Sequence, residues 1–340
     1  MRYWPTIQDE RLKSLDLRSS PSLHCEENVT VLPVIRAHVP MRAAAGTRNT
    51  ACIGAYGSDR RSIRALSLQK RAGFSPPPPY RKAEEFWPGE YVYGGIVWRH
   101  FGHFLLEGMS RIAGVRAKPD IPIVWHYIGD RAQMSGWQHE IVNMIGLAGR
   151  EHRIVDHPVM IERLWFSDQG YVIGKYFDTI HANTMAVHQF LLPTPGRRIW
   201  LSRSALHESQ KRILGESEVE DLLKLEGWII LHPEQLTVTE QLAALQDAEI
   251  ISGFEGSAFH ILMLARDVRA RIVIAAGARS LGYDYSIIGA VKKSDQYVLE
   301  IPATPVDRPG GRPLVRIDRP VDVLSGLREI RKDMVSEIIE

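Results

Sequence analysis

The sequence predicts an α/β protein with two Rossmann-like domains. In its second half, short apolar runs alternate with helix-like segments, which is typical of a parallel sheet covered on both faces. The length of 340 residues is about twice that of a typical domain. PTPG at 193–196 interrupts the chain between these halves. We therefore expect domains over 1–192 and 193–340, facing each other across a cleft, and leave open whether the C-terminal helix packs back on the first domain.

The second half gives the clearest element boundaries. Ser217 is a candidate N-cap of one helix and Gly227 its candidate C′ residue. Thr237 and Glu240 have the spacing of a capping box at the start of the next helix. We expect strands at 197–204, 227–234 and 271–277, helices at 217–227 and 237–248, and a strand, glycine turn and helix in succession within 249–265.

The first half is less regular. Gly94 and Gly95 interrupt an expected strand at 89–98 near its end. SPPPPY at 75–80 predicts a stiff connector, and the segment 41–70 shows no clear periodicity. Because ligands of such sheets bind outside the carboxyl ends of the strands, we expect the site between the two domains. The other expected elements are strands at 29–35, 121–128 and 152–156, and helices at 99–111, 135–147 and 181–192.

Composition narrows the function classes. The chain is 44% hydrophobic and 24% charged, which is ordinary for a globular protein. Its net charge of +2 is too weak to indicate nucleic-acid binding but suits one local anion site. Cys25 and Cys52 match no metal spacing, and so few thiols indicate a reducing compartment. Without a signal peptide or a long apolar run, we expect a cytoplasmic protein; peripheral membrane attachment and oligomerisation stay open.

The segment GFEGSAFH (253–260) is the first candidate site. Gly253 and Gly256 flank a turn between a strand and a helix, where glycine lets the backbone approach a ligand. Unpaired N–H groups at the helix start attract an anion, and the Ser257 hydroxyl is a further donor. The alternative is an ordinary tight turn. Glu255 argues mildly against direct phosphate contact.

The segment LSRSALHESQKR (201–212) is the second candidate. Ser202 and Arg203 come at the end of an expected strand, where the ligand cleft should lie. Arg203 offers a planar set of donors that fits a diphosphate, and Lys211 or Arg212 adds positive charge. The alternative is a solvated basic loop.

The segment RHFGHFLLE (99–107) is the third candidate. His103 and Glu107 are one helical turn apart, so the carboxylate can fix the imidazole tautomer and raise its basicity. Such a pair can remove a proton from a hydroxyl. Two alternatives remain: a metal site that includes His100, which lacks the HExxH spacing, and a hydrogen-bonded core pair.

Two further residues carry weaker signals. His260 comes one turn into the helix after the glycine turn, where it either faces the cleft or lies in the core. Glu216 precedes the helix at 217–227 and needs no role beyond starting it.

Taken together, these segments resemble glycosyltransferase family 61, specifically its bacterial polysaccharide-biosynthesis branch. The resemblance spans roughly 90–265. Many eukaryotic members carry an HGAG-type turn where this chain has EGSA at 255–258. The matching blocks are, in order, YGGIVWRHFGHFLLEGMSRI, IWLSRSAL and RILGESEVEDLLKLEGWIILHPEQLTVTEQLAALQDAEIISGFEGSAFHILMLA.

The resemblance implies a GT-B enzyme that moves a sugar from a nucleotide-sugar donor to a hydroxyl of a glycan, polysaccharide or lipid-linked glycan, with inversion. The second domain would bind the donor, with its diphosphate against Arg203, Gly256 and Ser257 and without a required divalent metal. The first would bind the acceptor, with His103 or Glu107 as the base.

Two rival classes remain. An NAD-dependent oxidoreductase would need a GxGxxG fingerprint, which the chain lacks. A non-catalytic sugar-binding or assembly protein with a transferase fold is the other.

Overall fold

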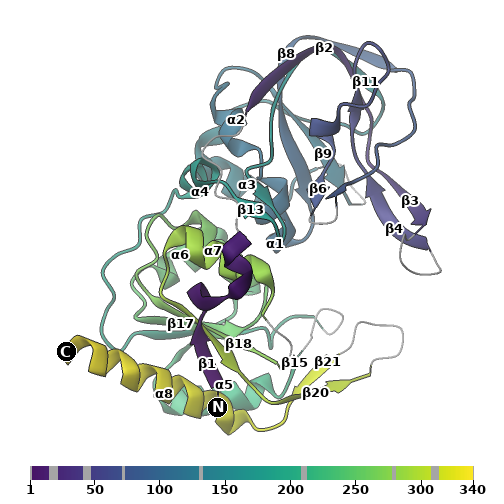
Figure 1. Ribbon diagram of the computed structural model, residues 1–340. Helices are drawn as coiled ribbons and strands as arrows, with labels where there is room; N and C mark the ends of the chain where they lie inside the picture. The colour runs from purple at the N-terminus through teal and green to yellow at the C-terminus, as the bar shows by residue number, and fades with distance from the viewer. Residues whose placement is uncertain are drawn as a thin grey trace. The chain divides into compact units, whose positions relative to one another are not determined.

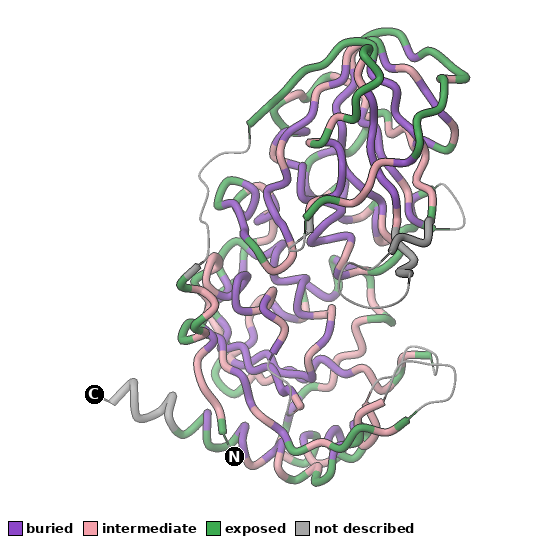
Figure 2. The backbone as a smooth tube through the Cα atoms, turned by 45° about the vertical axis from the view of Figure 1, so that its right-hand side comes forward, coloured by how far each residue is buried: buried purple, intermediate pink, exposed green. Residues whose placement is uncertain are grey.

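The computed structural model describes residues 2–14, 22–40, 47–70, 73–129, 133–207, 213–277, 281–307 and 314–339. The chain divides into two compact units (Figure 1). The C-terminal unit consists of Met1–Ser14 and His188–Glu340, and the N-terminal unit of Leu15–Val187. Each unit is a mixed α/β structure that contains parallel strands. Backbone that is buried runs through the sheet of each unit (Figure 2).

The first residues of the chain correct the expected domain boundary. We expected residues 1–14 in the first domain, but β1 (Arg2–Pro5) pairs antiparallel with β19 (Gln296–Glu300) in the C-terminal unit. The reason is edge pairing, because β1 supplies partners for the otherwise open edge of β19. The C-terminal helix α8 (Pro320–Ile339) packs against α5 (Glu216–Leu225), β1 and β19 of this same unit.

The sheet of the C-terminal unit has the order β1-β19-β18-β17-β14-β16. All its strands are parallel except β1. Taken in chain order, the five parallel strands follow the doubly wound pattern 2-1-3-4-5, whose direction reverses between β14 and β17. The bounds are Arg198–Leu201 for β14, Ile229–Leu231 for β16, Ile250–Phe254 for β17 and Arg271–Ala276 for β18.

Helices cover this sheet, and its central strands are therefore buried. Every residue of β17 and β18 is buried, as expected of central parallel strands. Helix α6 (Val238–Leu245) begins with the predicted capping box of Thr237 and Glu240. Helix α5 begins one residue earlier than expected, because Gly215 and not Ser217 is its N-cap, with a φ of 90°. The helix expected after the glycine turn is a 3-10 helix, η7 (Ser257–Leu264), and α7 covers Tyr283–Lys292.

The N-terminal unit contains a sheet of order β10-β9-β8-β11-β2-β5. Strands β10, β9, β8 and β11 are parallel, and β2 and β5 are antiparallel additions. The parallel strands follow the order 3-2-1-4, so the direction reverses between β8 and β11. The bounds are Leu23–Val31 for β2, Ala55–Tyr56 for β5, Glu85–Trp98 for β8, Ile123–Ile128 for β9, His152–Ile154 for β10 and Val159–Ser167 for β11.

Several boundaries in this unit differ from those expected. The early strand lies at β2 rather than at 29–35, because it pairs along β11 from Leu23 onward. The expected helix at 181–192 is α4 (Thr179–Met185), which Asp178 caps and which ends before the pairing of His188 with Ala265. Within the described part of the chain, no helix has both the length and the apolar character needed to cross a bilayer.

The helix expected at 99–111 consists of α1 (Phe101–His103) and the π-helix η4 (Phe104–Gly108). A further short helix, α2 (Ile112–Arg116), follows it. Helix α3 (Gly136–Val142) likewise continues into the π-helix η5 (Asn143–Leu147). The remaining elements are β3 (Ile35–Pro40), β4 (Thr47–Cys52), β6 (Gln69–Lys70), β7 (Gly73–Phe74), β12 (Tyr171–Val172), β13 (Tyr176–Phe177), β15 (Ile213–Leu214), β20 (Ala303–Val306), β21 (Leu314–Ile317), and the 3-10 turns η1 (Thr6–Gln8), η2 (Glu10–Ser14), η3 (Arg64–Leu66) and η6 (Pro233–Gln235).

Candidate functional site

Two loops lie side by side at the carboxyl edge of the C-terminal sheet, where the strand order reverses. One follows β14 and carries Ser202 and Arg203, and the other follows β17 and carries Glu255 and Gly256. The loops are adjacent because β14 and β17 are paired neighbours, with Leu201 opposite Gly253. Ligands of doubly wound sheets bind at such a reversal. This edge is therefore the candidate binding site of the C-terminal unit.

Arg203 and Gly256 are in direct contact at this edge. The Arg203 Nη1 atom donates a hydrogen bond of 2.9 Å to the carbonyl of Glu255. A Cβ added to Gly256 would lie 3.1 Å from Nη1 and 3.3 Å from Cζ of Arg203. The glycine is thus explained by this close approach, since its φ of −176° is open to any residue. The planar guanidinium of Arg203 therefore lies against the backbone of Gly256, which carries no side chain.

The Glu255 side chain turns toward α7. Its carboxylate accepts a 3.0 Å hydrogen bond from the backbone N–H of Gly282, which precedes α7. Burial raises the pKa of Glu255, while the charge of Arg203 and the bond from Gly282 oppose the rise. Glu255 therefore joins the end of β17 to the start of α7.

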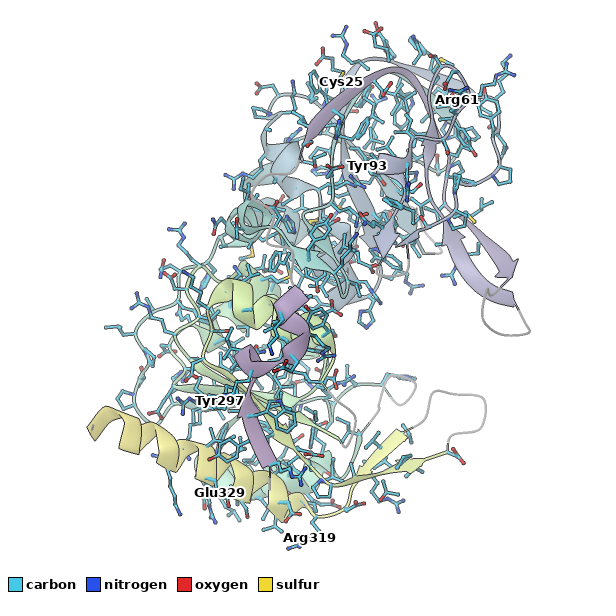
Figure 3. The ribbon with its side chains drawn as sticks, viewed as in Figure 1. Cys25, Arg61, Tyr93, Tyr297, Arg319 and Glu329 are labelled. Atoms are coloured by element: carbon cyan, nitrogen blue, oxygen red, sulfur yellow. The ribbon has the colours of Figure 1, made fainter. Side chains whose placement is uncertain are left out.

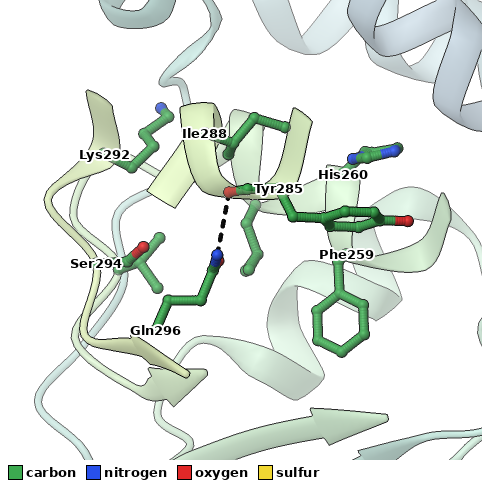
Figure 4. A pocket seen from close by; sticks show the side chains of 9 residues that line it. Phe259, His260, Tyr285, Ile288, Lys292, Ser294 and Gln296 are labelled. Carbon is green, nitrogen blue, oxygen red and sulfur yellow. Dashed lines mark hydrogen bonds between the residues drawn. The ribbon is translucent and has the colours of Figure 1, made fainter. Parts of the chain in front are cut away.

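Ser257 and His260 belong to the 3-10 helix that follows this turn. Ser257 is its first residue and is partly buried. His260 is buried and stacks on Tyr285 of α7, with ring centroids 5.0 Å apart (Figure 4). Both rings line a narrow crevice together with Lys292, and burial lowers the pKa of Lys292 to about 8. His260 thus packs between two helices.

Ser202 lies beneath the site. It is 1% exposed, and its hydroxyl donates a 2.6 Å hydrogen bond to Oε1 of Glu220 on α5. The hydroxyl oxygen of Ser202 also accepts a hydrogen bond from the backbone N–H of Ser204 at 3.0 Å. Ser202 therefore fixes the turn that carries Arg203. The remaining candidate of this loop, Arg212, lies outside the described residues.

Glu216 makes a contact that its sequence position did not indicate. Its Oε1 atom accepts the backbone N–H of Arg203 at 3.1 Å, and the residue is 3% exposed. Burial raises the pKa of Glu216 to about 7; the neighbouring Glu220 adds to the rise and Arg203 opposes it. Because the strand order was unknown, no signal in the sequence indicated that α5 starts beneath the Arg203 loop.

In the N-terminal unit, His103 and Glu107 form a hydrogen-bonded pair. The distance between Nδ1 of His103 and Oε2 of Glu107 is 2.6 Å. The Glu107 side chain is fully buried, whereas that of His103 is 44% exposed. A carboxylate accepts a hydrogen bond from Nδ1–H, so in the neutral ring Nε2 carries the lone pair. Trp98 stacks on this imidazole with centroids 5.0 Å apart.

The two residues follow β8, beside the reversal in the N-terminal sheet. The π-turn is defined by the hydrogen bond from Met109 N to Phe104 O, 2.9 Å. Two glycines bring this turn against β8: a Cβ on Gly108 would lie 2.5 Å from the Ile96 carbonyl, and one on Gly95 would lie 2.5 Å from the Gly108 carbonyl. This backbone contact fixes Glu107 over the end of the strand.

The structure corrects the position of His100. It is the N-cap of α1, with extended φ and ψ of −87° and 126°, so it does not share a helical face with His103 and Glu107. Its ring meets that of His103 at 60°, with centroids 5.1 Å apart. In the part of the chain that the structure describes, no three histidine, cysteine or acidic residues gather as metal ligands would.

Sequence reasoning missed a buried network next to this pair. Arg111 is 4% exposed and donates to the carbonyls of Ser167 and Ala65. Its guanidinium lies 5.4 Å from the ring centre of Tyr93, inside the N-terminal unit (Figure 3). Glu107, Arg111 and Tyr93 all line one narrow crevice. The only signal was that Arg111 ends the apolar segment 99–111.

The same network contains a neutral histidine. The Tyr93 hydroxyl lies 2.6 Å from Nδ1 of His126, and the His126 Nε2 atom lies 2.9 Å from the carbonyl of Leu32. Because a carbonyl only accepts, Nε2 carries the proton and Nδ1 accepts from the tyrosine. Burial lowers the pKa of His126 to about 4.

The part of the chain that contains these residues also resembles a known protein family. The family model described as Glycosyltransferase 61 matches residues 101–273, about half of the chain. The match begins at the helix that carries His103 and Glu107 and includes Arg203 and Gly256. A search of curated proteins gives no match. The extent of the family match shows that the chain belongs to the glycosyltransferase 61 family.

Proposed function

We propose that the chain is an inverting glycosyltransferase of the bacterial polysaccharide-biosynthesis branch. It would move a sugar from a nucleotide-sugar donor to a hydroxyl of a glycan, polysaccharide or lipid-linked glycan. The observation that carries this proposal is the meeting of Arg203 with Gly256 where the strand order of a doubly wound sheet reverses. Such an edge suits an anionic nucleotide, and the family supplies the transferase class.

On the donor side, Arg203 is the residue that binds the diphosphate. A guanidinium gives parallel N–H donors that match phosphate oxygens, and the bare backbone at Gly256 allows close approach. Ser257 adds a hydroxyl at the start of η7. The leaving diphosphate gains negative charge as the sugar departs, so fixed donors stabilise the transition state without a required metal. Ser202, Glu255 and His260 support this site through their contacts.

On the acceptor side, His103 is the base. In the transfer step, the acceptor oxygen bonds to the anomeric carbon while the bond from that carbon to the diphosphate oxygen breaks. The hydroxyl proton moves to Nε2 of His103, and Glu107 stabilises the resulting imidazolium. The exposure of His103 over the buried Glu107 favours the histidine; direct base catalysis by Glu107 is the alternative. Attack opposite to the leaving group gives inversion.

The proposal extends to the domain arrangement and the cell compartment. We propose a GT-B arrangement, in which one nucleotide-fold unit binds the donor and the other binds the acceptor. Cys25 and Cys52 are both free thiols, which supports work in the reducing cytosol. A lipid-linked acceptor would bring the enzyme to the membrane surface.

A thermal-shift screen tests the donor proposal. UDP-, GDP-, CMP- and dTDP-sugars are added separately, and a binding donor at about 100 times its dissociation constant should raise the free energy of unfolding by about 2.7 kcal/mol. The shift should disappear in Arg203→Ala. Arg269→Ala is the matched control, because this exposed arginine precedes β18 at the amino edge of the same sheet. A full shift in Arg203→Ala, or no shift with any donor, would contradict the proposal.

A further inference from the structure

Two buried carboxyl groups support the loop that carries Arg203. Glu216 and Glu220 are 3% and 5% exposed and lie one turn apart on α5. Glu216 accepts the backbone N–H of Arg203 at 3.1 Å, and Glu220 accepts the hydroxyl of Ser202 at 2.6 Å. Each of two consecutive loop residues is therefore held by its own carboxyl group.

The two carboxyl groups differ in the charges that surround them. Glu220 has a cation near it, because Nζ of Lys224 lies 3.9 Å from its Oε2. Among the residues that the structure describes, the charged groups with the largest effect on the pKa of Glu216 are Arg203, from the β14 loop, and Glu220, from its own helix. Arg203 is thus the cation that favours the ionised form of Glu216.

We propose that Glu216 is a positioning residue for Arg203 and that it takes up a proton when a nucleotide diphosphate binds. This inference rests on the proposed donor site. A diphosphate beside Arg203 brings negative charge that offsets the guanidinium, so the cation no longer favours the Glu216 carboxylate. The buried carboxyl group then binds a proton from solvent. Its carbonyl oxygen still accepts the Arg203 N–H, so the loop keeps its position.

The ionisation of Glu216 makes this coupling measurable near neutral pH. Because burial raises its pKa to about 7, the free protein holds the group partly protonated there. A bound anion raises that pKa further, so by linkage the donor must bind more tightly at lower pH. The expected weakening between pH 6.0 and 8.0 is about five- to tenfold in Kd.

Titration calorimetry at pH 6.0, 7.0 and 8.0 tests the inference. The probes are UDP-glucose, GDP-mannose and dTDP-glucose, whose diphosphate diesters do not titrate in this range. In Glu216→Gln the Kd should change less than twofold across the series and stay near the wild-type value at pH 6.0, because glutamine keeps the hydrogen bond without the charge. Glu218→Gln is the matched control: this exposed glutamate of α5 should leave the wild-type pH dependence intact.

A second readout does not depend on any variant folding. Binding heats measured at pH 7.0 in phosphate and in Tris report the protons taken up, and wild type should take up a fraction of one proton. No uptake by wild type would overturn the inference. A wild-type pH dependence in a folded Glu216→Gln protein would also overturn it, since nearby histidines would then account for the same sign.

Arg203→Ala separates this failure from failure of the donor site. If Arg203→Ala binds the donor as tightly as wild type, the donor site itself is wrong. If it binds weakly while Glu216→Gln keeps the wild-type pH dependence, only the role of Glu216 is wrong. Absence of binding by all three probes overturns both.

Discussion

At the residue scale, the environment of His103 determines which nitrogen can act as a base. The Nδ1 atom of His103 is hydrogen-bonded to Oε2 of the buried Glu107 at 2.6 Å. Proton transfer from an acceptor can therefore involve only Nε2 of His103. We expect His103→Ala to lower kcat about 10²–10⁴-fold, the usual contribution of general base catalysis. Glu107→Gln should lower kcat less, because the amide keeps a hydrogen-bonding partner beside the imidazole but stabilises the imidazolium less.

The assay is initial-rate transfer with the donor found in the thermal-shift screen. His100→Ala is the matched control, since this neighbouring histidine meets His103 only through its ring edge. Its activity should stay within a few fold of wild type. Transfer that survives both His103→Ala and Glu107→Gln within a few fold would rule out this pair as the base.

Individual site residues were predictable where the contact is local. The spacing of His103 and Glu107 predicts their hydrogen bond, because residues four apart in a helix are neighbours. The contact between Arg203 and Glu216 was not predictable. It depends on where α5 starts relative to the β14 loop, and the unexpected Gly215 cap sets that start. Roles in catalysis and donor binding stay predictions.

At the element scale, the π-helix η4 packs against β8 through one glycine in each element, Gly108 in η4 and Gly95 in β8. We expect Gly108→Ala to destabilise the fold by about 1–3 kcal/mol, because its Cβ would lie 2.5 Å from the Ile96 carbonyl and the turn must move. Since Glu107 belongs to this turn, transfer activity should fall as well. Chemical denaturation and kcat measure the two effects.

Gly136→Ala is the matched control for that variant. Gly136 lies in α3, a Cβ added to it would meet no atom within 4 Å, and it has no positive φ. Alanine there should leave stability unchanged or raise it by up to about 1 kcal/mol. Equal behaviour of the two variants would show that backbone contact at Gly108 does not hold the turn.

Elements were predictable where apolar runs and caps coincide. The capping box of Thr237 and Glu240 predicted the start of α6, and the strand expected within 249–265 is β17. The π-turn at 104–108 and the 3-10 form of η7 were not predictable. The π-turn packs its backbone against β8 at Gly108 and Gly95, and such a contact has no periodic signature in the sequence.

At the scale of a whole unit, the buried His126 makes stability depend on pH. Its pKa is about 4 in the folded state and about 6.5 when unfolded, so its stabilising contribution is present above pH 6.5 and is lost as the pH falls toward 4. We expect this residue to cost about 2 kcal/mol of unfolding free energy between pH 7 and pH 5. His126→Gln should reduce the loss, because an amide can accept from Tyr93 and donate to Leu32.

Urea unfolding at both pH values measures this difference. Wild-type protein unfolded at the same two pH values is the reference. An unchanged acid sensitivity in His126→Gln would contradict the lowered pKa of the buried His126.

The α/β class and the existence of parallel strands were predictable from alternating elements, and the family match agrees with the resemblance in the sequence. The strand order was not predictable from the sequence, because strands that pair with each other but lie far apart in the chain leave no local pattern. The membership of residues 1–14 shows this most clearly: RYWP gives no indication that its partner is QYVLE at 296–300.

That pairing makes the N-terminal unit an insertion within the other unit. The N-terminal unit is complete once residue 187 has been synthesised, whereas β1 is synthesised before that unit and its partner β19 after it. One edge of the doubly wound unit is therefore formed by strands that lie on either side of the N-terminal unit in the chain. Until ribosomal synthesis reaches residue 300, the leading strand is an unshielded pairing surface, and this order of events exposes the nascent chain to mispairing.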